Sequence, residues 1–366
     1  MFKRMLSVAS VLAVVAPMAT GALAQEEKVL NVYNWFDYIG ESTIADFEKE
    51  TGIKVNYDTF DSNEILEAKL LAGNSGYDVV VPSANFMERQ IQAGVFMELD
   101  RDKLSNYSNL DEAILDRVSV HDEGNAHSVP YMWGTTGFGY NVADVTERMA
   151  DAPVDSWDLI FKPEIVSKFA DCGVAFIDSP AEVMGIALNY LGLDPNSEKK
   201  KDLEKAQELM LSIRPYIKYF NTGQYLNDIA NGEVCIAVGY SGDFSIAQVR
   251  AEEAGQGIEI AYVIPNEGTQ MWFDMLAIPE DAPHAENAHA FIDFILRPEV
   301  AAGVSNYVFY ANPNKAATEL VDPAITGDPS IYPNDDTKAN LFAMKAHTPK
   351  YDRKLTRAWT KVKTGR

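Results

Sequence analysis

The segment VLNVYNWFDYIGESTIADFEKETGIKVNYDTFDSNEILEAKLLAGNSGYDVVV, residues 29–81, alternates between two patterns. Three β-rich runs are separated by two stretches in which apolar residues recur at helical spacing. We predict strands at 29–33, 53–57 and 78–81 and helices at 42–50 and 63–72, the first of which Gly52 ends. Links this short between β, α and β segments indicate a mostly parallel sheet covered by helices on both faces.

The middle of the chain begins a second unit of the same kind. We expect strands at 173–178, 234–240, 258–265 and 272–278, and helices at 181–191, 198–213, 285–296 and 340–345. Without its first 24 residues the chain has 342 residues (366 minus 24), more than one hydrophobic core usually fills. We therefore predict two α/β domains, with crossings between them at the Gly-rich stretches 134–137 and 255–257.

The first 24 residues have the parts of a secretory signal peptide. Lys3 and Arg4 supply the positive start, an apolar run follows from Met5 to Ala16, and a small-x-small pattern precedes the expected cleavage after Ala24. The apolar run is too short to persist as a transmembrane helix, and no Cys offers a site for lipid attachment. We expect a periplasmic protein rather than a cytoplasmic one with an amphipathic N-terminal helix.

The composition is strongly acidic, with a net charge of −23 that becomes −25 when Lys3 and Arg4 are removed. Such a field repels nucleic acid and anionic membranes and attracts cations, although acidity also serves solubility alone. The charge therefore argues against a nucleic-acid partner and favours a cationic ligand only slightly.

The two cysteines, Cys172 and Cys235, predict one disulfide in an oxidising compartment. The closed loop of 63 residues (235 minus 172) would stabilise the fold by roughly 4 kcal/mol. Neither cysteine has a Cys or His neighbour at metal-ligand spacing, so we expect no metal site.

Motifs of catalysis and of cofactor binding are incomplete in this chain. The segment GYSGD at 239–243 lacks the final glycine of a nucleophile elbow, and Gly137-Phe138-Gly139 lacks the third glycine of a dinucleotide fingerprint. His284 and His289 are five residues apart and do not share a helix face as metal ligands. We expect no enzyme, no catalytic residue and no cofactor.

Aromatic, hydroxyl and carboxylate side chains recur where the predicted strands end, which is where ligands bind in such sheets. These stretches are 34–38 (NWFDY), 58–63, 83–86 (SANF), 178–182 (DSPAE) and 240–243 (YSGD). The same residue types occur at 272–274 (WFD), which lie on the predicted late strand itself. Each type also has a structural role, since Trp and Tyr often belong to the core and Asp178 could cap the next helix. Recurrence at several strand ends favours the functional interpretation.

This set of residue types suits an organic ammonium ion. A primary ammonium group donates three hydrogen bonds and accepts none, so it needs carboxylates around it. Aromatic faces attract the cation and cover a methylene chain between two amines. An anionic ligand would require Arg, Lys or free backbone N–H groups, and these loops contain no Arg or Lys.

The chain resembles the periplasmic putrescine- and spermidine-binding proteins of bacterial polyamine ABC transporters, and is most similar to the putrescine-binding subgroup. The matching stretches are VYNWFDYI at 32–39, FEKETGIKV at 47–55, FDSNEILEAKLLAG at 60–73, DVVVPSANF at 78–86, PYMWGTTGFGYN at 130–141, PVDSWDLIFKPE at 153–164, ANGEVCIAVGYSGD at 230–243, VFYANPNKAAT at 308–318 and TRAWTKVKTGR at 356–366. They cover nearly all of the chain after residue 24.

The resemblance implies a two-lobed type II periplasmic binding fold, each lobe a mostly parallel sheet flanked by helices, with the ligand in the cleft between the lobes. We expect an N-terminal lobe of residues 25–134 plus 256–318 and a C-terminal lobe of residues 135–255 plus 319–366. It also implies a disulfide between Cys172 and Cys235, monomeric behaviour and delivery of the ligand to an inner-membrane ABC permease.

The resemblance further implies a ligand site. Its aromatic and hydroxyl lining would be Trp35, Tyr38, Ser83, Tyr240, Trp272 and Tyr310, and its carboxylates Glu182, Asp243 and Asp274. Asp37 would be a carboxylate near the cleft mouth that acts through water, and Phe36 would face the pocket. Phe36 stands where the family commonly has Ser, Tyr240 where some members have Trp, and Trp272 where Phe is common. These departures leave open whether putrescine, spermidine or agmatine is preferred. A sensor that presents a polyamine or another organic cation to a membrane receptor is the alternative to a transport component.

Overall fold

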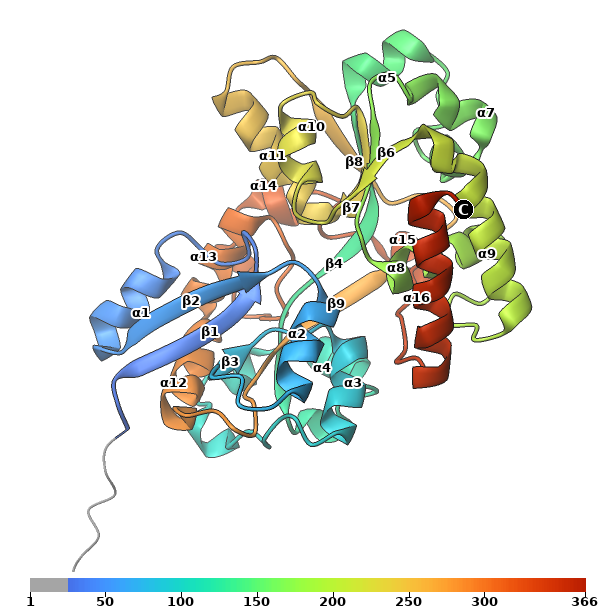
Figure 1. Ribbon diagram of the computed structural model, residues 1–366. Coiled ribbons are helices and arrows are strands. Elements are labelled where there is room, and N and C mark those ends of the chain that lie inside the picture. Colours follow the sequence, from blue (N-terminus) through green and yellow to red (C-terminus); the bar gives the residue numbers. More distant parts are fainter. Residues whose placement is uncertain (1–25) are drawn as a thin grey trace, which may run out of the picture.

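The computed structural model describes residues 26–366, so the predicted signal peptide at 1–24 lies outside the described residues. This part of the chain forms two lobes, each a sheet flanked by helices (Figure 1). The strands are β1 Val29–Trp35, β2 Lys54–Phe60, β3 Val79–Val80, β4 Ser128–Asn141, β5 Val174–Phe176, β6 Ile217–Phe220, β7 Ile236–Tyr240, β8 Ile260–Val263 and β9 Met271–Ala277. Their order is β2-β1-β3-β9-β4-β7-β5-β6, with β8 paired to β4.

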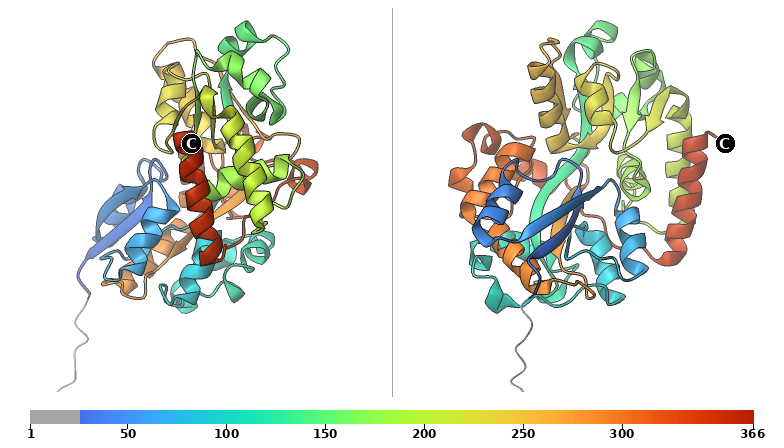
Figure 2. Two further views of the ribbon diagram at one scale, coloured as in Figure 1. Left: turned by 45° about the vertical axis from the view of Figure 1, so that its right-hand side comes forward. Right: turned by 60° about the vertical axis from the view of Figure 1, so that its left-hand side comes forward.

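The α-helices pack on both faces of these sheets (Figure 2). They are α1 Thr43–Thr51, α2 Asn63–Leu71, α3 Ala84–Gln92, α4 Glu112–Val118, α5 Val142–Arg148, α6 Asp158–Phe161, α7 Pro163–Val166, α8 Pro180–Tyr190, α9 Lys200–Ile213, α10 Tyr225–Ala230, α11 Ser241–Glu253, α12 Ala285–Ile295, α13 Pro298–Val308, α14 Pro323–Thr326, α15 Asp335–Ala339 and α16 Pro349–Thr364. Gly52 ends α1 with φ of 70°, as its lack of a Cβ allows. The Ser62 hydroxyl caps α2 by accepting the N–H of Ile65.

Each lobe contains three neighbouring parallel strands. In one lobe β1 lies between β2 and β3, and in the other β5 lies between β6 and β7, all in parallel pairs. This is the βαβ arrangement that the sequence predicts. Strands β4 and β9 add antiparallel pairs to both groups, so the complete sheet is mixed.

Strand β4 runs through both lobes. Its first half, from Ser128 to Thr135, pairs with β9, and its second half, from Thr136 onward, pairs with β7 and β8. The change of partner falls inside 134–137, where we expect the chain to cross. Nearly every residue of β4 is buried, so the strand lacks the apolar–polar alternation that would identify it in the sequence.

Three apolar cores hold the lobes together. Two cover opposite faces of the N-terminal sheet: Leu30 and Val32 of β1 belong to one core, and Tyr33, on the opposite face, belongs to the other. The third fills the C-terminal lobe around Trp157, Phe176 and neighbouring residues. We call the strands β1, β2, β3 and β9 with their helices the N-terminal lobe, and the remainder around the third core the C-terminal lobe.

The return of the chain to the N-terminal lobe differs from the expected position. Strand β8 still pairs with the C-terminal half of β4, so the return follows Val263 rather than the stretch 255–257. Val321 and Ile325, which we expect in the C-terminal lobe, are buried in a core of the N-terminal lobe. The exact lobe boundaries stay a proposal.

The tail differs from the sequence prediction of a helix at 340–345. Phe342 instead forms a β-bridge with Gln270, accepting the N–H of Met271 and donating to Thr269. The long helix of the tail is α16, whose buried stripe of Tyr351, Leu355, Ala358, Trp359 and Val362 packs on the C-terminal core. Edge pairing with a distant strand end therefore overrides the local helical pattern.

The predicted disulfide is present between Cys172 and Cys235, with Cα atoms 5.5 Å apart. It joins the turn before β5 to the residue before β7, two strands that also pair side by side. In the described part of the chain no helix is long and apolar enough to cross a membrane.

Candidate functional site

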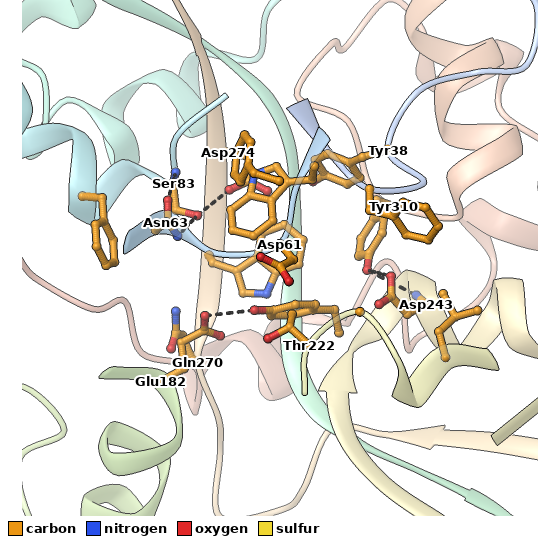
Figure 3. A pocket seen from close by; sticks show the side chains of 18 of the residues that line it. Tyr38, Asp61, Asn63, Ser83, Glu182, Thr222, Asp243, Gln270, Asp274 and Tyr310 are labelled. Atoms are coloured by element: carbon orange, nitrogen blue, oxygen red, sulfur yellow. Dashed lines mark hydrogen bonds between the residues drawn. The ribbon is translucent and has the colours of Figure 1, made fainter. Parts of the chain in front are cut away.

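A cavity lies between the two lobes, where the carboxyl ends of their parallel strands meet (Figure 3). Its volume is about 790 Å³, which includes open solvent at the mouth. The lining residues are Trp35, Phe36, Tyr38, Phe60, Asp61, Asn63, Ser83, Asn85, Phe86, Glu182, Thr222, Gly223, Leu226, Tyr240, Asp243, Gln270, Trp272, Asp274 and Tyr310. Ten of the eleven residues expected at a ligand site are in this set.

The eleventh, Asp37, follows the lining residue Phe36 but does not itself line the cavity. Its carboxylate forms an ion pair of 2.6 Å with Arg250 of α11, which belongs to the other lobe. The backbone of Asp37 has φ of 52°, a conformation that L-residues rarely adopt. Its neighbour Phe36 lines the cavity but stays 53% exposed, so its ring covers the entrance rather than the floor.

Asp274, on β9, forms one acidic pole of the cavity. It accepts a hydrogen bond of 2.6 Å from the Ser83 hydroxyl, which itself accepts a bond of 3.0 Å from the side-chain amide of Asn63. Burial raises the pKa of Asp274 to about 7, although the Ser83 hydroxyl opposes this shift. Ser83 follows β3, Asn63 begins α2 and Asp274 lies within β9, so three segments of the N-terminal lobe build this pole.

Asp243, in the first turn of α11, forms a second pole from the C-terminal lobe. Its two carboxylate oxygens accept the hydroxyls of Tyr225 at 2.5 Å and Tyr310 at 2.6 Å. Burial raises the pKa of Asp243 to about 6, while the two hydroxyls hold it lower than burial alone would. The helix N-terminus adds favourable partial charge for a carboxylate at this position.

Glu182, in the first turn of α8, forms the third pole. It accepts hydrogen bonds from the hydroxyls of Thr136 at 2.9 Å, Ser179 at 3.0 Å and Tyr240 at 3.2 Å. Burial raises its pKa above the usual range of a glutamate. Asp178, from the same strand end, does not line the cavity, because its carboxylate accepts from Trp359 and pairs with Lys363 of α16.

Aromatic rings form the walls between these poles. Trp272 lies 5.4 Å from the ring of Tyr310 and 5.7 Å from that of Tyr240, the second pair being nearly perpendicular. Tyr38 meets Tyr310 at 5.2 Å, also edge to face. Such contacts fix the rings at defined angles and leave faces directed at the space between them.

The charge of the lining is entirely negative. Among the residues that the structure describes, no Lys, Arg or His lines the cavity, whereas three partly or fully buried carboxylates do. Buried carboxylates without a cationic partner are unfavourable. A ligand carrying two or more ammonium groups would supply the missing charge, and its methylene chain would contact the aromatic walls. In residues 26–366 no group of three or more His, Cys, Asp or Glu is placed to hold a metal ion.

The remaining lining residues were not singled out by the sequence, for two reasons. Some lie in the predicted strand-end stretches 58–63 and 83–86, but the sequence does not indicate which side chains of these stretches face the cavity. They are Phe60, Asp61, Asn63, Asn85 and Phe86. Others lie outside every stretch that the sequence pattern indicated as part of a ligand site. They are Thr222, Gly223, Leu226 and Gln270. Thr222 and Gly223 follow β6, a strand that the sequence pattern did not reveal, and a correct prediction of β6 would have pointed to them.

Comparison with known proteins places these features in context. Residues 42–333 match the family described as bacterial extracellular solute-binding protein. The chain is similar to a putrescine-binding periplasmic protein of Escherichia coli (strain K12), with 53% identity over 95% of each chain. It is also similar to a putrescine-binding periplasmic protein of Pseudomonas aeruginosa (strain UCBPP-PA14), with 50% identity over 100% of each chain. Among solved structures, a putative spermidine/putrescine ABC transporter protein of Listeria monocytogenes superposes with a TM-score of 0.84 at 35% identity, covering 93% of this chain and 100% of that one.

Proposed function

We propose, from the premise that this chain belongs to the family of bacterial extracellular solute-binding proteins, that it binds putrescine or a related polyamine and delivers it to an ABC permease. The observation that carries this proposal is the set of Glu182, Asp243 and Asp274 in a cavity that no cationic side chain lines within residues 26–366. The likeness to two putrescine-binding periplasmic proteins supports the polyamine class.

The geometry suggests how a diamine would be held. One ammonium group would donate to Asp274, and the other would donate to Asp243 or Glu182, while the rings of Tyr38, Trp272 and neighbouring aromatics enclose the methylene chain. Asp243 and Asp274 lie on different lobes, so a bridging dication would draw the lobes together. Closure would then be coupled to ligand recognition.

The cellular setting is part of the same proposal. Export with cleavage after Ala24 would place the monomeric protein in the periplasm, where its ligand reaches it before transport. Spermidine and agmatine remain candidate ligands beside putrescine, because Phe36 alters the entrance and the three carboxylates offer more acceptors than one diamine needs.

The test is calorimetric titration of ligand-free protein, prepared by unfolding and refolding, with putrescine, spermidine and agmatine. Saturable binding of at least one is expected, and ligand at about 100 times its dissociation constant should stabilise the fold by roughly 2.7 kcal/mol. Absence of both heat and thermal shift with all three would refute the proposal.

Two variants locate the site. Asp243→Asn and Asp274→Asn should each weaken binding, because each removes a charge partner in a desolvated cavity. Unchanged affinity in both would place the ligand elsewhere.

Uptake of labelled polyamine by cells that lack the protein separates transport from sensing, since normal uptake would favour a sensor.

A further inference from the structure

Tyr225 is buried behind the wall of the cavity and does not line it. It is the first residue of α10, and its ring belongs to the core of the C-terminal lobe. Its hydroxyl nevertheless reaches two residues of the site: it accepts the backbone N–H of Tyr240 at 2.9 Å and donates to Asp243 at 2.5 Å. Tyr225 thus connects the end of β7 to the carboxylate on α11.

The direction of these hydrogen bonds is fixed. A backbone N–H acts only as a donor, so the Tyr225 hydroxyl must accept from Tyr240 and directs its own proton to Asp243. Tyr310 repeats the pattern: its hydroxyl accepts the backbone N–H of Asp243 at 3.2 Å and donates to the other carboxylate oxygen. Both phenols are donors to Asp243, which favours the ionised carboxylate.

Two glycines in GYSGD, residues 239–243, make room for these phenols. A Cβ on Gly239 would lie 2.4 Å from ring atoms of Tyr225, and a Cβ on Gly242 would lie 2.5 Å from the ring of Tyr310. Neither glycine adopts a positive φ, so close approach of a ring is the reason for glycine at both places. Gly239 and Gly242 therefore leave room for the two phenols that orient Asp243.

The two phenols come from different lobes. Tyr310 belongs to the N-terminal lobe and reaches Asp243 across the cleft, so separation of the lobes would break its bond, whereas Tyr225 and Asp243 share the C-terminal lobe. We propose that Tyr225 is a positioning residue that holds the Asp243 carboxylate oriented and ionised for the ammonium group of the ligand before the lobes close. This inference rests on the proposed polyamine-binding function.

Other groups also act on Asp243. Asp37, from the loop after β1, raises its pKa and Arg250 of α11 lowers it, while the hydroxyls of Tyr225 and Tyr310 lower it directly. Tyr240 and Tyr262, from β7 and β8, also lie near this carboxylate; burial raises the pKa of both phenols, and the Asp243 charge adds to the shift. Since Asp37 and Arg250 pair with each other at the mouth, their opposing effects partly cancel, which leaves the phenols as the decisive partners.

The test compares putrescine affinity between pH 6 and pH 8.5 for the wild type and for Tyr225→Phe, which keeps the ring that packs against Gly239. We expect affinity at pH 7 to fall about tenfold, the effect of losing one hydrogen bond to a charged group. The pH below which affinity declines should rise by about one unit, because the carboxylate loses a donor that favours its ionised form.

Tyr219→Phe is the matched control. Tyr219, on β6 of the same lobe, donates to Asp228 at 2.7 Å and lies outside the cavity, so its loss should leave the affinity profile unchanged. A purely structural role for Tyr225 would lower affinity equally at every pH, and that result would overturn the proposal. Absence of wild-type binding would instead refute the polyamine function itself.

A second variant keeps the inference testable if Tyr225→Phe does not fold. Incorporation of 3-fluorotyrosine at position 225 retains the hydroxyl and makes it a more acidic donor. The decline in affinity should then move to lower pH, and an unchanged midpoint would contradict the proposed role of Tyr225.

Discussion

Binding of a polyamine should release protons from the cavity, because burial raises the pKa of its carboxylates. Burial raises the pKa of Asp274 to about 7 and that of Asp243 to about 6. At pH 7 the first group therefore holds about 0.5 proton and the second about 0.1 proton. The amino groups of a polyamine have pKa values near 10 and are therefore charged at pH 7. Their binding favours the ionised carboxylates, so the protons held by Asp274 and Asp243 are released.

The expected release is about 0.6 proton at pH 7 and about 0.1 proton at pH 8, with any protonated Glu182 adding to both values. The sign follows from the direction of the shifts: the free protein binds more protons than the complex, so affinity must rise with pH through about 6 to 7 and level off only near pH 8.

Calorimetric titration with putrescine in phosphate and in Tris, at the same pH, measures this number. The slope of the observed enthalpy against the ionisation enthalpy of the buffer equals the protons exchanged. Asp274→Asn serves as the control, since it should abolish most of the release at pH 7. A zero slope at pH 7 in the wild type would refute the reasoning, because it would show that the carboxylates are already ionised in the free protein.

Three further predictions address single interactions. Asp274→Asn should weaken putrescine binding by about 30-fold or more in calorimetry, since a buried charge partner is lost; a loss below threefold would contradict this. Arg250→Ala breaks the ion pair with Asp37 across the cleft mouth, and because both side chains are about one-third exposed, stopped-flow dissociation should accelerate only roughly two- to fivefold. Replacing Cys172 and Cys235 together by Ser should lower the free energy of unfolding by roughly 4 kcal/mol, judged from the loop length, and an unchanged urea midpoint would count against it.

The candidate site was largely predictable because parallel strands bring their carboxyl ends to one edge. The residues after β1, β3 and β7 could be identified from local patterns, and the fold rule then places them together. The same reasoning could not show which side chains of a strand-end stretch face the cavity: Asp37 pairs with Arg250, and Asp178 pairs with Lys363. Partners more than 180 residues away in the sequence decided their orientation.

The limits of local pattern are clearest at β4 and in the tail. A fully buried strand such as β4 shows no alternation, and its Gly and Thr residues suggested a crossing rather than a strand. Near 340–345 a helical pattern yielded to pairing with Gln270, a residue 72 positions from Phe342 (342 minus 270). In both places, hydrogen bonds to residues far away in the sequence determine the backbone conformation, and a local sequence pattern cannot reveal them.

The sequence by itself determined the α/β class, the two-domain organisation, the disulfide pair and the acidic and aromatic side chains at the strand ends, because these depend on periodicity, composition and spacing. Only the tertiary structure decided how those side chains are held. The hydroxyl of Tyr225 acts on Asp243 from inside a core, and Gly239 matters because a distant ring occupies the place of its Cβ. Such roles arise from packing between separate segments, and packing exists only once the chain has folded.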